Sequence, residues 1–254
     1  MRKLVACLIA LAATAVTGNQ ASAANIAYIN ASGGSVNYLT GYGHTVTNFN
    51  DPIGLTLGSL AGYDAILIAS NGIFTQATNI GNVAKQFADA GGGVVLAQFA
   101  FQGQWQVGGG ITNAGYSPFI NDPLSSGYFI SSSLGTVYDP TSPLLNGVTP
   151  GSTTTDYQAN VGLDASAILV ADWASGRHAI AYNLLPNSAV VGLNLFPDGS
   201  YLTSADSQRL VSNAINFSVN ASATTPEPVS LLVFGGLVAS GGWLVRRRMK
   251  AAVA

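Results

Sequence analysis

The chain has 254 residues, of which 48% are hydrophobic and only 8% are charged. Nine basic residues stand against eleven acidic ones, but only three of the basic and ten of the acidic residues lie within 24–222. The acidic surface of that region makes nucleic acid and anionic membranes poor partners. The single cysteine, Cys7, excludes an intrachain disulfide and a cysteine-rich metal site.

The first 23 residues have the organisation of a secretory signal peptide. A basic start at residues 2–3 and an apolar core at residues 4–16 precede the small-residue motif Ala21-Ser22-Ala23. This order predicts cleavage before Ala24. Cys7 lies inside the apolar core without a lipobox, so the mature protein is expected to contain no cysteine.

The remaining body, residues 24–222, is acidic but carries few charges. It contains three basic residues against ten Asp and no Glu, hence a net charge of −7. About 200 residues are enough for one domain with a sizeable core.

The first half of the body predicts strands alternating with helices. Residues 64–70 form a nearly continuous apolar run, typical of a strand buried on both faces. Residues 79–90 have apolar positions at helical spacing and end at three glycines. This alternation favours an α/β three-layer domain with a mostly parallel sheet. The other predicted elements are strands at 25–30, 44–49 and 94–101 and a short helix around 35–41.

The second half is less regular. A glycine-rich stretch runs from residue 103 to 149 and admits a hairpin over residues 128–138. Strands are then predicted in close succession, which favours an antiparallel extension of the sheet, and a final helix follows. These strands are 167–171, 179–183 and 189–195, and the helix is 204–217.

The C-terminal tail, residues 223–254, has three parts in a fixed order. Pro226-Glu227-Pro228 comes first, an apolar span at 229–245 follows, and basic residues occupy 246–250. As a helix the span would rise about 26 Å, slightly short of a hydrocarbon core of roughly 30 Å. The basic end is expected to stay in the cytoplasm, which leaves the body outside.

This tail resembles the PEP-CTERM sorting signal, which exosortases recognise and cleave in Gram-negative bacteria that make extracellular polysaccharide. The matching residues are Pro226, Glu227, Pro228, the glycine-bearing span, and Arg246, Arg247 and Arg248. The resemblance implies signal peptidase and exosortase as partners during export and transient insertion in the inner membrane. The final location would be the cell surface or the extracellular matrix.

Two other interpretations of the span stay open. It could be a permanent single-pass anchor, or its small residues could form a helix-packing face. Each glycine costs a helix roughly 1 kcal/mol relative to alanine, which a span destined for removal tolerates better than a permanent anchor does. These glycines are Gly235, Gly236, Gly241 and Gly242.

The body resembles the class I glutamine amidotransferase-like (ThuA-like) superfamily. The strings GYDAILIASN and FADAGGGVVLAQ match its first half, and SPLLNGV, ILVADWASGRHAIAYN and SAVVGLNLFPDG match its closing half. The resemblance covers most of residues 25–217 and implies a flavodoxin-like, doubly wound core. Enzymes of this superfamily carry a cysteine on the turn after the strand matching 94–97, and a downstream histidine as base.

Here the matching stretch, residues 97–101, reads Ala-Gln-Phe-Ala-Phe and has no cysteine. Since a thiolate is the nucleophile of that chemistry, the sequence predicts no amidotransferase activity. The body also lacks a G-x-S-x-G nucleophile motif, an H-x-x-x-H pair and a calcium-loop pattern, so no metal or cofactor is expected. His44 is expected at the surface or at a sheet edge.

A ligand site is expected beyond the carboxyl ends of the parallel strands. The flexible loop predicted there places one indole, Trp105, among amides that include Gln102 and Gln104. Aromatic faces with neighbouring amides suit sugar rings. His178, at the start of a later strand, completes this tentative set.

The sequence therefore predicts an exported, non-catalytic matrix protein, structural or glycan-binding, in an exopolysaccharide or biofilm setting. One alternative is a secreted hydrolase acting on carbohydrate or peptide through His178 or Asp198. Another is an ectodomain that stays anchored in the membrane.

Overall fold

The computed structural model describes residues 23–121 and 128–223. Its strands are β1 (Asn25–Asn30), β2 (Thr45–Asn50), β3 (Ala65–Ile68), β4 (Gly93–Ala97), β5 (Phe119–Ile120), β6 (Tyr128–Val137), β7 (Thr154–Gln158), β8 (Gly162–Leu163), β9 (Ile168–Trp173), β10 (His178–Leu185) and β11 (Ser188–Leu193). Its α-helices are α2 (Ala77–Asp89) and α3 (Ala205–Ala223). Its short 3-10 helices are η1 (Asn37–Tyr42), η2 (Leu57–Leu60), η3 (Gly103–Trp105), η4 (Gly109–Thr112), η5 (Pro143–Leu145) and η6 (Pro150–Ser152).

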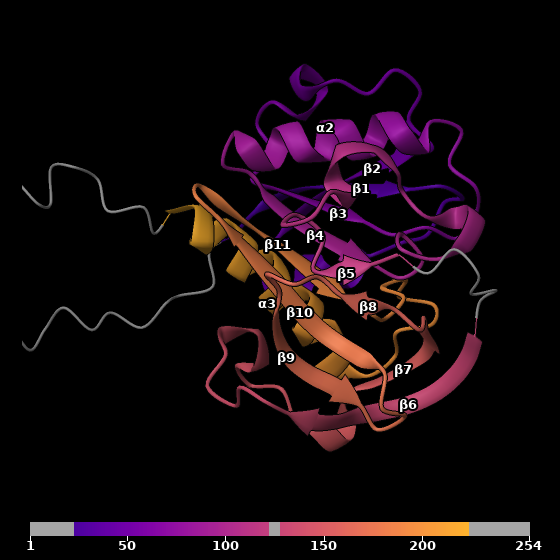
Figure 1. Cartoon of the computed structure of the whole chain (residues 1–254), viewed down its shortest axis with the longest axis vertical. Helices are drawn as coiled ribbons and strands as arrows, with labels where there is room; N and C mark the ends of the chain where they lie inside the picture. The colour runs from indigo at the N-terminus through magenta and orange to yellow at the C-terminus, as the bar shows by residue number, and fades with distance from the viewer. Residues whose placement is uncertain (1–22, 122–127, 224–254) are drawn as a thin grey trace, which may run out of the picture. The chain divides into compact units, whose positions relative to one another are not determined.

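A mixed sheet of nine strands organises the body, in the order β2-β1-β3-β4-β11-β10-β9-β6-β7 (Figure 1). The strands from β2 to β11 in this order are parallel, and those from β11 to β7 pair antiparallel. The parallel part with its antiparallel extension therefore agrees with the sequence prediction. We call the side on which β1, β3, β4 and β11 finish the carboxyl edge.

Helices cover both faces of the sheet, which gives the predicted three layers (Figure 1). The apolar positions of α2 pack on one face with Ile66, Ile68 and Val94. Those of α3 pack on the other face with Leu67 and Val191. The crossovers on either side of β2 contain only the 3-10 helices η1 and η2, so the parallel part carries fewer α-helices than a doubly wound fold usually does.

Strand β4 is shorter than predicted, because it ends at Ala97 and not at Phe101. The apolar run continues past the strand for a packing reason. Phe99 enters the core on the face of α3, whereas Ala100 and Phe101 enter the core on the face of α2. Burial of a turn thus imitated the pattern of a longer strand.

The hairpin over residues 128–138 is wrong, since this segment is the single strand β6. Its first part pairs with β7 and its second part with β9, with a register irregularity in each pairing. Gly135 marks a close approach and not a turn. A Cβ atom at Gly135 would lie 2.7 Å from the backbone nitrogen of Ala174, which follows β9.

The loop after β4 is built against α2. Its 3-10 helix η4 packs on that helix, and a Cβ atom at Gly81 would lie only 1.7 Å from the carbonyl oxygen of Gly108. The Gly110 N–H also donates to Asn82 Oδ1 at 2.7 Å. These contacts hold in place a segment that its glycines made look flexible.

Both predicted sorting segments, 1–23 and 223–254, lie almost entirely outside the described residues. Within residues 23–121 and 128–223, no helix is long and apolar enough to cross a membrane. The predicted span at 229–245 lies outside the described residues, so this finding does not concern it.

Candidate functional site

Gln98 occupies the position where the resemblance implied a nucleophile. It follows β4 directly, is fully buried, and its backbone N–H donates to the carbonyl of Leu195 at 3.0 Å. Its side-chain Nε2 donates to Oε1 of Gln102, which is 2% exposed. Gln102, expected to meet a ligand, is thus a buried partner of Gln98.

The other two loop residues of the predicted sugar site lie on η3. Gln104 is exposed. Trp105 is partly buried and packs edge-on against Phe99, with the ring centroids 5.0 Å apart. The indole therefore contributes to the core as well as to the surface.

Trp105 belongs to a larger group of rings at the carboxyl edge, which we call the aromatic cluster. Phe99 lies 5.3 Å from Tyr157 and 5.4 Å from Phe196, as measured between ring centroids. Its members come from the ends of β4 and β11, from β6 and β7, and from the turn before α3. They are Phe99, Trp105, Phe129, Tyr157, Phe196 and Tyr201.

The outer rings of the aromatic cluster face solvent. Phe129 is 68% exposed and Tyr201 is 47% exposed, and both pack edge-on against Tyr157 at 5.3 and 5.6 Å. Burial, followed by the neighbouring Tyr201 and Asp156, raises the pKa of Tyr157. The Tyr157 phenol is accordingly uncharged at neutral pH, and the rings of the aromatic cluster offer both edges and faces to a ligand.

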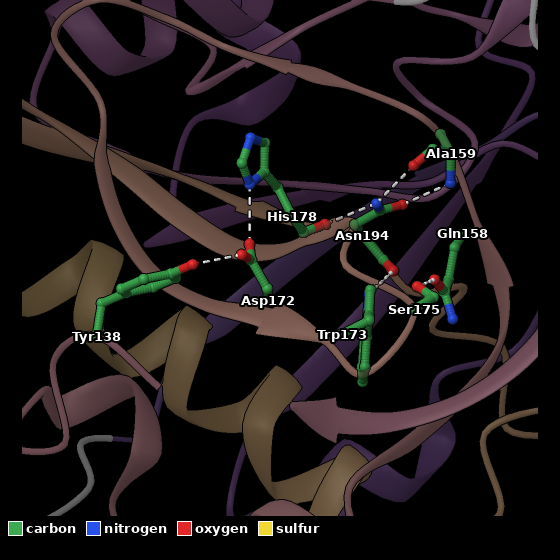
Figure 2. Close-up of polar contacts among 8 residues, drawn as sticks. All are labelled: Tyr138, Gln158, Ala159, Asp172, Trp173, Ser175, His178 and Asn194. Carbon is green, nitrogen blue, oxygen red and sulfur yellow. Dashed lines mark hydrogen bonds and ion pairs between the residues drawn. The ribbon is translucent and has the colours of Figure 1, made fainter. Parts of the chain in front are cut away.

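His178 forms a second candidate site with residues that sequence reasoning missed. Its Nδ1 lies 2.8 Å from Asp172 Oδ1, and Asp172 Oδ2 accepts a 2.7 Å hydrogen bond from Tyr138 Oη (Figure 2). The His178 side chain is 30% exposed and that of Asp172 is 12% exposed. With Nδ1–H donating to the carboxylate, Nε2 is left as an acceptor, the arrangement of a histidine oriented for proton transfer.

A sequence signal for this pair existed. Asp172 and His178 are partners in the register of the β9–β10 hairpin, so the string DWASGRH places them opposite each other across a Ser175-Gly176 turn. Tyr138 carried no comparable signal, because it comes from the end of β6. Its hydrogen bond to Asp172 raises the pKa of the Tyr138 phenol.

Asn194 holds the backbone beside His178 in place. Its buried side chain donates to the carbonyls of His178 and Ala159 at 2.7 and 2.9 Å and accepts from the Ala159 N–H at 2.8 Å (Figure 2). The Asn194 carbonyl also accepts from the Trp173 indole N–H at 2.9 Å. Every polar atom of this side chain is used, which is typical of a structural clamp.

Asp198 and His44 have structural surroundings. Asp198 is 6% exposed and accepts from the N–H groups of Ser200 and Ser35 at 2.8 and 3.1 Å. Within the described residues it shares no hydrogen bond or ion pair with His178. The expectation of a surface or edge His44 is wrong in its exposure, since this residue is only 3% exposed.

His44 is buried because it joins two distant segments. Its Nδ1 accepts from the N–H of Ala24 at 3.2 Å, and its Nε2 lies 3.0 Å from Ser212 Oγ on α3. Burial lowers the pKa of the imidazole. Across residues 23–121 and 128–223, no group of three or more His, Cys, Asp or Glu side chains could hold a metal ion.

Comparison with solved structures supports the fold. The chain is similar to a protein described as ThuA-like from Bacteroides uniformis, at 11% identity and a TM-score of 0.56, over 79% of this chain and 94% of that one. A cytoplasmic protein from Salmonella typhimurium matches at 12% identity and a TM-score of 0.58, over 76% and 99% of the two chains.

A third match is a protein described as part of a GMP synthase from Thermoplasma acidophilum, at 12% identity and a TM-score of 0.51, over 81% of this chain and 100% of that one. No family model and no curated protein matches the chain significantly. At this identity the likeness shows the fold alone, and it supports a ThuA-like fold for the body.

Proposed function

We propose that the protein is an exported, non-catalytic component of the cell surface or extracellular matrix that binds neutral polysaccharide through the aromatic cluster. The observation that carries this proposal is the exposure of Phe129 and Tyr201, the outer rings of the aromatic cluster at the carboxyl edge. Ligands of open α/β sheets bind at that edge. The buried amide of Gln98 stands there in place of a thiol nucleophile.

The side chains of the aromatic cluster suit a sugar as the ligand. Aromatic rings stack on the apolar face of a pyranose, and the Tyr157 and Tyr201 hydroxyls can bond its hydroxyl groups. A body with a net charge of −7 repels acidic polymers, so a neutral glycan is the preferred partner. Exposed Gln104 adds a side chain with both donors and an acceptor.

The exposed rings are the sharpest test of binding. Phe129→Ala and Tyr201→Ala should each weaken binding to the producer's own exopolysaccharide about tenfold, which corresponds to roughly 1.4 kcal/mol. Leu184→Ala is the matched control. Leu184 is 59% exposed, but it lies near the C-terminal end of β10, away from the carboxyl edge of the sheet. Unchanged affinity in both ring variants would contradict the glycan proposal.

Trp105→Ala is a weaker test by itself. Because Trp105 packs against Phe99, its removal alters the core along with the surface. A loss of binding in this variant counts only if its unfolding free energy stays within about 1 kcal/mol of the parent protein.

Export rests on the two ends of the sequence. We propose removal of residues 1–23 by signal peptidase and cleavage near Pro226 to Pro228 by an exosortase after transient membrane insertion. Intact-mass measurement of fractionated native protein reports both cleavages and the final location. A mass that retains residues 229–250 in the membrane fraction would favour a permanently anchored ectodomain.

The Asp172–His178 contact of 2.8 Å favours one rival function, a secreted hydrolase. In that mechanism Asp172 orients His178, whose Nε2 takes a proton from a water molecule as the water attacks the anomeric or carbonyl carbon. The protonated His178 then returns the proton to the leaving alcohol or amine as the glycosidic or peptide bond breaks. His178→Ala and Asp172→Asn should then abolish turnover, while Asp198→Asn tests the other residue proposed for this role. Sugar binding without turnover in the parent protein favours the matrix role.

A further inference from the structure

A separate cavity of about 350 Å³ lies on the other side of the loop that carries Trp105. It is formed between residues of the segment 106–112 and residues of the segment 117–121, which contains β5, and Asp164 after β8 completes the lining. Trp105 and Gln106 are consecutive, yet Trp105 packs into the aromatic cluster whereas Gln106 lines this cavity. The loop therefore stands between two distinct surfaces.

The lining combines the groups that recognise a polyol. The polar side chains are those of Gln106, Thr112, Ser117, Asn121 and Asp164, and Ile120, which is 55% exposed, supplies apolar surface. Among the residues that the structure describes, no basic side chain lines the cavity. Its volume is at the small end of ligand sites, which suits a ligand of one ring better than a dinucleotide or a peptide.

Asp164 supplies a fixed negative charge. Its Oδ1 accepts from Ser166 Oγ at 2.5 Å and from the Gly115 N–H at 3.3 Å. The Ser166 hydroxyl is the largest of the contacts that lower the pKa of this carboxyl group, so it stays ionised at neutral pH. Within the described residues Oδ2 receives no hydrogen bond, and it can accept from a ligand hydroxyl.

Gln106 gives an independent indication of a ligand. Its Oε1 is buried and has no hydrogen-bond partner among the described residues. A buried amide oxygen without a partner is costly and calls for an explanation such as a bound group. Asn121 donates to the Val107 carbonyl at 3.3 Å, which leaves its amide oxygen to accept.

We infer that this cavity binds one neutral sugar residue through Gln106, Asn121 and Asp164, with Ile120 against its apolar face. The carboxylate excludes uronate, sulfated and phosphorylated sugars, because nothing in the lining offsets a second negative charge. The inference deepens the proposed function, on which the choice of a glycan rests. It adds a second contact for the same polymer beside Trp105.

The test uses the exported protein and soluble probes, namely methyl glucoside, methyl galactoside and glucuronate, in ligand-observed NMR. A neutral methyl glycoside should bind and glucuronate should not. Gln106→Leu and Asp164→Asn should each weaken that binding about tenfold. Gln106→Leu should nevertheless raise the melting temperature of the sugar-free protein, because it removes the buried unpartnered oxygen.

Several results would overturn the inference. These are glucuronate binding as well as the neutral sugars, unchanged affinity in Gln106→Leu, or no signal from any neutral glycoside. Leu184→Ala, the control used above, should leave binding of the single sugar intact. If the protein binds methyl glycosides but not the polymer, the proposed function is contradicted and the inference about the cavity stands. If it binds the polymer but not the methyl glycosides, only the inference about the cavity is contradicted.

Discussion

The two halves of the sheet differ in how they satisfy buried polar groups. In the antiparallel half, Asn194 and Asp172 use their side-chain atoms in hydrogen bonds to neighbouring segments. At the ends of β1 and β4 in the parallel half, Tyr28 Oη, Asn30 Nδ2 and Gln98 Oε1 are buried without a partner among the described residues. Hydrogen bonds are therefore expected to contribute more around Asn194 and Asp172 than at the ends of β1 and β4, although Ser142 Oγ and Ser188 Oγ in the antiparallel half also lack a partner among the described residues.

The largest effect is expected at Asn194. Asn194→Leu should destabilise the protein by about 3 kcal/mol, because it leaves the Ala159 N–H and two carbonyls buried without partners. Urea unfolding measures this change. Asn187→Ala is the control, since Asn187 is exposed and its substitution should stay within about 0.5 kcal/mol.

The second prediction concerns close packing in the parallel half. Glycine to alanine normally stabilises a helix interior by about 1 kcal/mol, but Gly81→Ala should cost about 2 kcal/mol. The added Cβ would meet the Gly108 carbonyl at 1.7 Å and push the loop from α2. Gly41→Ala is the matched substitution, because nothing lies within 4 Å of a Cβ there. Equal effects at both glycines, measured by urea unfolding, would contradict the proposed close approach.

A smaller effect, dependent on pH, is expected from His44, where the parallel half meets α3. Burial lowers its pKa below the ordinary 6.5, so the unfolded chain binds its proton more readily than the folded chain does. The stabilisation is complete above pH 6.5 and is lost as the pH falls through the lowered pKa. Thermal unfolding from pH 7.5 to 5 should show this loss, and His44→Gln should flatten the profile. A parallel decline in both proteins would assign the loss to other groups.

Features that depend on local sequence patterns could be predicted, whereas features that depend on contacts between distant segments could not. Residues 64–70 and 79–90 were predicted correctly because burial on two faces and helical spacing leave strong local patterns. The aromatic cluster could not be predicted, since Phe99, Phe129 and Tyr201 meet only through the strand order. Trp105 was singled out for its composition, which says nothing of its packing on Phe99.

The smallest expected effect is the difference in unfolding free energy between two tyrosine variants at the carboxyl edge. Tyr28→Phe should be neutral or stabilising by up to about 1 kcal/mol, because the lost hydroxyl is buried without a partner among the described residues. Burial, together with the nearby Asp198, raises the pKa of that phenol, so it stays neutral. Tyr38→Phe is the matched change and should cost about 1 kcal/mol, since the Tyr38 hydroxyl donates to the Pro197 carbonyl at 3.0 Å.

The difference between these two variants, measured by urea unfolding at neutral pH, is more informative than either value. Both remove one oxygen from rings beside Asp198, so solvation of the unfolded chain cancels. If Tyr28→Phe proved as costly as Tyr38→Phe, the Tyr28 hydroxyl would have a partner such as ordered water. Close packing would then no longer suffice to explain the parallel half, and its carboxyl edge would depend on hydrogen bonds as the antiparallel half does.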